Sequence, residues 1–262
     1  MPTRVLVGYD GSPAASGAID AAALLFPDAR AWITYLWAPP FASTSLRQRL
    51  WSGSSRVDEF VQAVEREGTR EAERTAAMGV TLARAAGWEA EPLVVRSYGG
   101  EGLQLAALAE ERHADLVLVG SRGLGGAEAV LGSVSDMVVH HAPVPVLVVP
   151  HPLLTAEFAA LDKGPVVVGV DDSDGARAAH ETAARLFPTR ALLPVTVDEG
   201  RGRAVAGALA ACGRDQAAAA LVVGSRGRSA LREIMLGSVA MATLHHAYRP
   251  VLVAPSPPPV AR

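Results

Sequence analysis

The sequence contains a single cysteine, Cys212, so no disulfide can form within the chain. A lone thiol is typical of a protein from a reducing compartment, and we interpret Cys212 as a small apolar residue. No apolar run approaches the roughly 18 residues of a membrane span. The opening segment MPTRVLVGYDGSP lacks the apolar stretch of a signal peptide. We therefore expect a cytoplasmic protein without a membrane partner.

The chain also lacks an excess of charge of either sign. Its 24 Lys and Arg against 27 Asp and Glu give a formal net charge of −3, which provides no electrostatic reason to expect nucleic acid as a partner. Of the 262 residues, 50% are hydrophobic and 19% are charged, so the chain can bury a sizeable core. This length fits one large domain or two modest ones.

What the chain does contain is an internal repeat. The segment RVLVGYDGSPAASGAIDAAALLFP (4–27) matches PVVVGVDDSDGARAAHETAARLFP (165–188), and LGSVSDMVVHHAPVPVLVVP (131–150) matches LGSVAMATLHHAYRPVLVAP (236–255). Asp10 lies 110 positions before Gly120, whereas Asp171 lies 53 before Gly224, so the second copy lacks 57 residues. We expect a first domain at 1–150, a linker at 151–164, a trimmed second domain at 165–255 and a tail at 256–262, and we call the two domains the first and second copy.

Both copies alternate short apolar runs with Ala-rich helical segments, a pattern typical of a doubly wound parallel sheet. Ser12 and Pro13 form a helix start, as N-cap and first helical residue. In the first copy the expected strands are 4–9, 31–37, 91–97, 114–120 and 145–149, and the expected helices are 13–26, 55–86, 101–113 and 132–141. In the second copy the expected strands are 165–170, 191–197, 219–223 and 250–254, and the expected helices are 174–187, 201–212 and 237–247. The second copy thus has four strands where the first has five.

The last strand of each copy, PVPVLVV and RPVLVA, is apolar and would form the edge of its sheet. Exposed apolar edges invite aggregation, so proteins cover them. Pairing these two strands with each other would cover both edges and would join the copies.

Glycine-rich turns follow matching strands in the two copies. The letters V-G-S-R-G begin at 119 and again at 223, and each run is followed by L-G-S-V at a helix start. Ligands of open parallel sheets bind beyond the carboxyl ends of the strands, glycines let the backbone approach a ligand, and helix starts attract anions. The candidate phosphate-binding residues are Gly120, Ser121, Arg122, Gly123, Gly132, Ser133 and Val134 in the first copy, and Gly224, Ser225, Arg226, Gly227, Gly237, Ser238 and Val239 in the second.

Gly8 and Asp10 end the first strand of the first copy, and Gly169 and Asp171 hold the same places in the second. A carboxylate there can accept hydrogen bonds from a ribose or a base. The glycine pattern is neither a Walker A loop nor the dinucleotide fingerprint. Ordinary turn chemistry, with Ser133 and Ser238 as helix caps, explains the same residues, so both interpretations stay open.

The set V-G-x-D-G-S, G-S-R-G, L-G-S-V-S and H-H-A-P-x-P-V-L-V-V resembles the universal stress protein family in both copies. The resemblance implies an α/β fold with two doubly wound parallel-sheet domains of strand order 3-2-1-4-5, joined through their last strands as a pseudo-dimer within one chain. It implies ATP or a related adenine nucleotide as the ligand, with or without Mg²⁺, and a stress-response regulator rather than an enzyme. A homodimer and an unidentified protein partner are compatible with it.

Two alternatives to this function stay open. The first is an interaction module of the same fold that binds no nucleotide. The second is an adenine-nucleotide-dependent hydrolase, whose group often carries S-G-G-x-D-S after the first strand. GYDGSP and GVDDSD stand at that place here, which disfavours the hydrolase.

The two copies differ in the loop that the resemblance assigns to the phosphates through Gly-x2-Gly-x9-Gly-[Ser/Thr]. Nine residues separate Gly227 from Gly237, as in the pattern, but eight separate Gly123 from Gly132. The charged residues of the loops are Arg226, Arg228, Arg232 and Glu233 in the second copy, against Arg122 and Glu128 in the first. We therefore expect the second copy to hold the phosphates better, although its missing helix and strand leave the adenine side less covered.

Two motifs have a metal-binding alternative. His140-His141 and His245-His246 are adjacent helical residues whose side chains point about 100° apart, which is poor for chelation, so we favour a charge at the helix end or a contact between the copies. DDSDG (171–175) could hold Mg²⁺, but one nucleotide contact, a turn and a helix cap explain it more simply. We predict no catalytic residue and no metal ligand.

Overall fold

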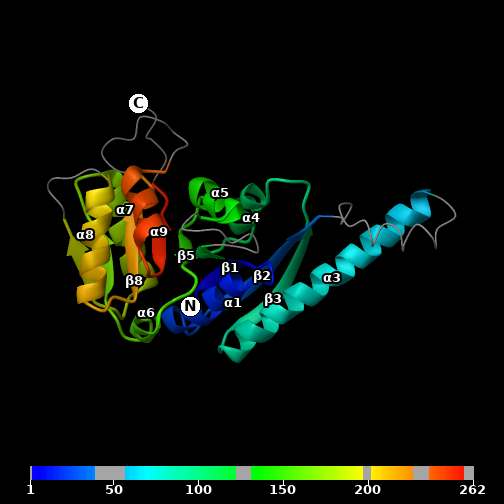
Figure 1. Cartoon of the computed structure of the whole chain (residues 1–262), viewed down its shortest axis with the longest axis horizontal. Helices are drawn as coiled ribbons and strands as arrows, with labels where there is room; N and C mark the ends of the chain where they lie inside the picture. The colour runs from blue at the N-terminus through cyan, green and yellow to red at the C-terminus, as the bar shows by residue number, and fades with distance from the viewer. Residues whose placement is uncertain (1, 39–56, 122–130, 197–201, 227–235, 257–262) are drawn as a thin grey trace.

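The computed structural model describes residues 2–38, 57–121, 131–196, 202–226 and 236–256. A single nine-stranded sheet runs through both copies in the order β3-β2-β1-β4-β5-β9-β8-β6-β7 (Figure 1). The first copy supplies β1 (Arg4–Gly8), α1 (Pro13–Leu25), β2 (Arg30–Trp37), α3 (Val57–Ala85), β3 (Glu89–Arg96), α4 (Glu101–Glu111), β4 (Leu116–Gly120), α5 (Ser133–His141) and β5 (Val146–Val149). The connector holds α6 (Thr155–Ala160), and the second copy supplies β6 (Val166–Gly169), α7 (Asp174–Leu186), β7 (Leu192–Val195), α8 (Gly202–Asp215), β8 (Ala220–Gly224), α9 (Ser238–His246) and β9 (Val251–Ala254).

The strand order confirms the predicted fold class. The first copy has the order 3-2-1-4-5, and every strand pair inside it is parallel. The second copy has four strands, because the equivalents of α3 and β3 are absent from its described part. The copies meet where β5 pairs antiparallel with β9, with Leu147 opposite Leu252. Both leucines are fully buried, so the two apolar edges cover each other as expected.

Helices cover both faces of the sheet, and each face has a hydrophobic layer that crosses from one copy to the other. One layer packs α1, α3 and α7 against the sheet, and the other packs α4, α5, α8 and α9. Strands buried on both faces read as continuous apolar runs, and Val5, Leu6 and Val7 of β1 are all fully buried. The described parts of the two copies therefore share both hydrophobic layers.

Serine caps start the two matching helices that follow the first strand of each copy. Ser12 Oγ accepts a hydrogen bond from the amide of Ala15, and Ser173 Oγ accepts one from the amide of Ala176, each at 3.1 Å. The predicted cap and first residue of α1 are thus confirmed. Each cap satisfies an amide that the first helical turn leaves unpaired, which fixes the chain direction just after the carboxyl ends of β1 and β6.

The connector contains a helix that the sequence did not predict. Glu157 of α6 lies 3.7 Å from Arg249, two residues before β9, and both side chains are less than a tenth exposed. Arg249 also donates a hydrogen bond to the carbonyl of Ala218 at 2.6 Å. The connector is therefore packed against the second copy rather than looping freely between the copies.

Prolines interrupt both outer edges of the sheet. In β3 the amides of Glu89 and Ser97 point toward β2. Amides alternate in direction along a strand, so Pro92 lies at a position whose amide would point away from the sheet. Pro194 lies at the equivalent kind of position in β7, opposite Val168. Because proline has no amide hydrogen, it blunts an edge that would otherwise pair with another chain.

The ends of α1 and α7 lie against each other across the pseudo-twofold relation of the copies. The rings of the equivalent residues Phe26 and Phe187 stack with centroids 5.1 Å apart. Arg190 donates to the carbonyl of Leu24 at 3.1 Å and to that of Gly164 at 3.0 Å. One arginine of the second copy thus holds both the end of α1 and the connector.

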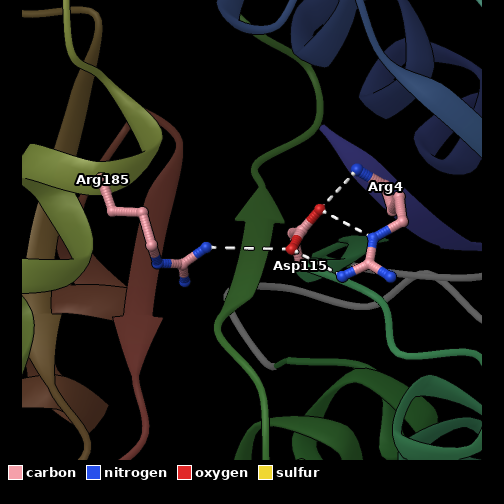
Figure 2. A network of polar contacts seen from close by, with 3 residues as sticks. All are labelled: Arg4, Asp115 and Arg185. Atoms are coloured by element: carbon pink, nitrogen blue, oxygen red, sulfur yellow. Dashed lines mark hydrogen bonds and ion pairs between the residues drawn. The ribbon is translucent and has the colours of Figure 1, made fainter. Parts of the chain in front are cut away.

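A charged cluster links the copies nearby (Figure 2). The Asp115 carboxylate accepts hydrogen bonds from the backbone amide and the guanidinium of Arg4, and Arg185 of α7 lies 4.0 Å away. Partial burial acts to raise the pKa of Asp115, but the hydrogen bonds and charge of Arg4 and the charge of Arg185 outweigh it, so the pKa lies below its usual value. Pro165 and Ala219 hold the places of Arg4 and Asp115 in the second copy. Proline has no backbone amide hydrogen and alanine has no carboxylate, so the second copy cannot form this hydrogen bond.

Among the helices in the described ranges, none is long and apolar enough to cross a membrane.

Asp115→Asn is expected to lower the free energy of unfolding at pH 7 by about 0.5–1 kcal/mol, because the cluster is partly exposed to solvent. A carboxylate whose pKa is depressed by folding contributes stability above its unfolded pKa, and this contribution is lost as the pH falls through the folded pKa. The gap between the native and substituted proteins should therefore narrow below about pH 4. Urea unfolding from pH 7 to pH 3 measures it, and a gap that stays constant over this range would rule out the electrostatic explanation.

Candidate functional site

The winding of the first copy reverses between β1 and β4. β1 has β2 on one side and β4 on the other, and the chain leaves β1 toward β2 and returns later to β4. In open α/β sheets, ligands bind at this point, beyond the carboxyl ends of the strands. Gly8 and Gly120 end these two strands, so the residues that follow them line the expected place.

Asp10 lies directly beyond β1, in a tight turn. Its Oδ1 accepts a hydrogen bond from the amide of Ser12 at 2.9 Å, and Gly11 between them has φ +78°, a value that favours glycine. Within the described part of the chain, no residue donates to the other carboxylate oxygen of Asp10. In the second copy the amide of Ser173 donates to Asp171 Oδ1, also at 2.9 Å, although Asp172 between them does not have a positive φ. The turn thus fixes one oxygen and leaves the other to accept from a ligand.

Tyr35 is close to Asp10 in the first copy. The amide of Tyr9 extends the pairing of β1 with β2 by donating to the carbonyl of Thr34 at 2.9 Å. Tyr9 therefore faces Tyr35 of β2, and Asp10 is the next residue along the chain. Burial raises the pKa of Tyr35, and the negative charges of Asp10 and of Glu71 on α3 raise it further. The phenol therefore stays protonated at neutral pH, and its hydroxyl can donate a hydrogen bond beside the carboxylate.

The glycines at the ends of β4 and β8 allow close approach of a neighbouring helix. A Cβ on Gly120 would lie 2.9 Å from the carbonyl carbon and oxygen of Ala14 in α1. A Cβ on Gly224 would overlap the backbone of Gly175 in α7 and would lie 2.9 Å from its Cα. These two candidate ligand residues therefore have a packing role, because backbone atoms cannot move aside easily.

The serines of the G-S-R-G motifs anchor the turns. The Ser121 amide donates to the Val149 carbonyl and the Ser225 amide to the Ala254 carbonyl, at 2.8 and 2.7 Å. Their hydroxyls accept hydrogen bonds from the amides of His151 and Ser256, at 3.2 and 2.9 Å. The side chains of Ser121 and Ser225 thus hold the chain that follows the last strand of each copy.

Glycines occupy the N-cap positions of the helices at the candidate phosphate end. Gly132 is the N-cap of α5 and Gly237 that of α9, and neither helix start has a side-chain cap. Of the two open interpretations of Ser133 and Ser238, the structure does not support helix capping, because each is the first helical residue, with its side chain exposed. Uncapped helix starts keep amide donors and partial positive charge for an anion, and the valines that follow, Val134 and Val239, contribute their amides to the same turns.

Several predicted site residues lie outside the described residues. These are Arg122, Gly123 and Gly227, together with the loop charges Glu128, Arg228, Arg232 and Glu233. Arg226 is described and half-buried. Gly8 and Gly169 occupy matching places, with Gly8 against Leu105 of α4 and Gly169 against Leu209 of α8.

The two motifs with a metal-binding alternative have other contacts. His140 Nδ1 lies 2.8 Å from the carbonyl oxygen of Asp136 and 3.6 Å from its carboxylate. In DDSDG, Ser173 caps α7, as the helix-cap interpretation predicts, and Asp174 pairs with Arg177. Across the described ranges, no three His, Cys, Asp or Glu side chains gather as a metal site would require.

Tyr35 and Ser135 were not predicted as site residues. Tyr35 lies in a strand whose pattern gives no polar signal, and only the register beside β1 brings it to Asp10. Ser135 Oγ donates to the Gly120 carbonyl at 2.7 Å, which ties the start of α5 to the end of β4. The repeat offered a signal for Ser135, because the matching residue of the second copy is Ala240.

The sequence model of the universal stress protein family matches residues 1–150 and 188–255. The chain belongs to this family. The universal stress protein YxiE of Bacillus subtilis is 31% identical over 153 residues, which cover 57% of this chain and 99% of that protein. A universal stress protein of Thermus aquaticus is 31% identical over 159 residues, again 57% of this chain and 99% of the relative. Relatives of this size correspond to one copy of the fold.

Solved structures also match nearly the whole chain. One from Archaeoglobus fulgidus has a TM-score of 0.62 at 16% identity and covers 97% of this chain and 98% of its own. A protein of unknown function from Pseudomonas aeruginosa has a TM-score of 0.58 at 12% identity, covering 97% of this chain and 93% of its own. At these identities the likeness concerns the fold, and it extends through both copies.

Gly224→Ala is expected to lower the free energy of unfolding by about 1–3 kcal/mol, because the added methyl meets the backbone of α7. Gly207→Ala in α8 is the matched control, since a Cβ there has no neighbour within 4 Å, and it should raise stability by about 0.5–1 kcal/mol through helix propensity. Urea unfolding with unchanged slopes measures both effects. Equal effects of the two substitutions would refute the close approach at Gly224.

Proposed function

We propose that the chain binds an adenine nucleotide, with ATP as the expected ligand and Mg²⁺ as its expected counter-ion. The observation that carries the proposal is the pairing of two complementary features across the reversal of the winding. On one side is the Asp10 carboxylate, with one oxygen held by Ser12 and the other available. On the other side is the uncapped start of α5 at Gly132.

The two features suit opposite ends of one ligand. A carboxylate accepts hydrogen bonds from ribose hydroxyls or from an exocyclic amine, and the neighbouring Tyr35 hydroxyl adds a donor. A helix start with free amides suits phosphate oxygens. A nucleotide has hydrogen-bond donors at its nucleoside end, which suits Asp10, and negative charge at its phosphate end, which suits the start of α5.

We further propose that the protein is a cytoplasmic regulator in the stress response rather than an enzyme. Binding needs only the groups named above, whereas rapid hydrolysis needs a positioned base or metal beside the phosphates. In the described part of the chain no group of three ligating side chains supports such a centre. Any hydrolysis is therefore expected to be slow, and the nucleotide acts by its presence or absence.

One observation favours a second candidate, an interaction module without nucleotide. The hydroxyls of Ser121 and Ser225 are engaged in holding the segments after β5 and β9. Two residues of the family motif thus have a structural use that needs no ligand.

Calorimetry of the full chain with ATP and Mg²⁺ distinguishes these functions, together with a nucleotide assay of protein purified under native conditions. Asp10→Asn should weaken ATP binding about tenfold, because it removes the charge from one accepted hydrogen bond. Asp20→Asn, the same change at an exposed position on α1, should leave the affinity unchanged.

No heat of ATP binding, and no adenine in the extract, would overturn nucleotide binding and favour the interaction module. Fast metal-dependent release of phosphate would instead make the protein an enzyme.

A further inference from the structure

We infer that the first copy alone binds the nucleotide and that the second copy is an internal partner with no ligand of its own. The inference rests on the proposed function and names which of two similar sites carries it. It reverses the expectation from loop length and charge, which favoured the second copy. It depends on differences between equivalent residues at both ends of the site.

The nucleoside end is enclosed in the first copy. Asp10 is half-buried there. Tyr35 on β2 lies close enough to have its pKa raised by burial and by the charges of Asp10 and Glu71. Helix α3 covers this region, and a Cβ on Gly11, beside Asp10, would lie 3.3 Å from the side chain of Thr75 on α3. A base or ribose entering here would meet protein on the α3 side.

The same end is open in the second copy. Asp171 is exposed, although it accepts a hydrogen bond from Ser173 as Asp10 does from Ser12. Strand β7 is the edge of the sheet, and Pro194 on it is exposed where the matching Ile33 of β2 is fully buried. Both differences follow from the absence of counterparts to α3 and β3. A hydrogen bond to Asp171 would be made in water, where it adds little net affinity.

The phosphate end of the second copy is crowded by a longer helix. α8 has 14 residues and α4 has 11. The two helices end at equivalent positions, because each ends equally far before the last glycine of the strand that follows it. The extra residues of α8 therefore add about one turn at its start. A Cβ on Gly202, its first residue, would lie 2.7 Å from the Cβ and carbonyl of Ser238 at the start of α9. The approach of α4 to α5 in the first copy is as close, but a Cβ on Gly102 would meet Met137 and the Val134 carbonyl rather than the first residue of the helix.

The missing loop residue does not displace the helix start of the first copy. The Gly132 amide donates to the Ser121 carbonyl at 2.8 Å, and the Gly237 amide donates to the Ser225 carbonyl at 2.7 Å. Both loops therefore close with the same bond, whatever their length. The first copy adds the hydrogen bond from Ser135 to Gly120, which Ala240 cannot make. Its helix start is the more firmly held of the two.

Two charge differences oppose the inference. The loop of the second copy has three arginines, against one in the loop of the first copy. Asp136 lies in the first turn of α5, and its negative charge disfavours a phosphate there. Its side chain is 44% exposed, so solvent screens much of this repulsion. The enclosure of the nucleoside end is the larger effect, because it decides whether the hydrogen bonds to the ligand are made out of water.

The second copy retains the contacts that a partner needs. β9 covers the edge of β5, Phe187 stacks on Phe26, and Arg190 caps the end of α1. All of these lie on the side of the second copy that faces the first. What the second copy lacks lies on its far side.

Calorimetric titration of the full chain with ATP tests the inference through matched substitutions. We expect one ATP per chain. Asp10→Asn should weaken binding about tenfold, and Asp171→Asn should change it by less than about twofold. Both substitutions are isosteric and keep the acceptor of the Asx turn, so folding should be preserved in each.

A second pair, Gly132→Val and Gly237→Val, tests the phosphate end. The first should abolish binding and the second should leave both stoichiometry and affinity unchanged, with circular dichroism as the folding control. Two ATP per chain, or a loss caused by Asp171→Asn or Gly237→Val, would overturn the assignment while leaving nucleotide binding intact. Absence of binding by the unsubstituted chain would instead contradict the proposed function.

Discussion

Strand β5 pairs antiparallel with β9, and the arrangement of the whole molecule depends on this pairing. Each strand is apolar and would otherwise be an exposed sheet edge. Joining them makes one sheet from two and extends both hydrophobic layers across the boundary. It also brings the ends of α1 and α7 together, so that Phe26 can stack on Phe187 and Arg185 can reach Asp115.

This constraint explains which part of the second copy could be lost. The missing counterparts of β3 and α3 would lie at the end of the sheet farthest from β9, so their loss leaves every contact with the first copy in place. The same loss exposes Asp171 and lets β7 lead to α8 without an intervening strand. A copy trimmed in this way keeps the role of a partner and gives up the enclosure of a ligand. We regard the asymmetry of the two sites as a consequence of where the sheet is joined.

Much of the fold could be predicted because its determinants are local or repeated. Neighbouring residues alone predict the cap at Ser12 and the apolar strand β1, and the repeat predicts the pairing of the last strands. Helix α6 was missed, since its packing depends on the long-range pair Glu157–Arg249. The site was harder, because Tyr35 joins Asp10 through strand register and Gly202 meets Ser238 through helix length. Loop length, the clearest sequence difference, does not change how the loops close, because both close with the same hydrogen bond.

Hydrogen exchange of the unsubstituted chain, with and without saturating ATP, tests the central claim most directly, because it reports on both sites at once. The amides at the start of α5 and in the turn after β1 should exchange more slowly with ATP, so protection should appear in peptides covering 8–14 and 131–136. The equivalent peptides, 169–175 and 236–241, should be unaffected. Equal protection in both copies, or protection in the second copy alone, would contradict the account.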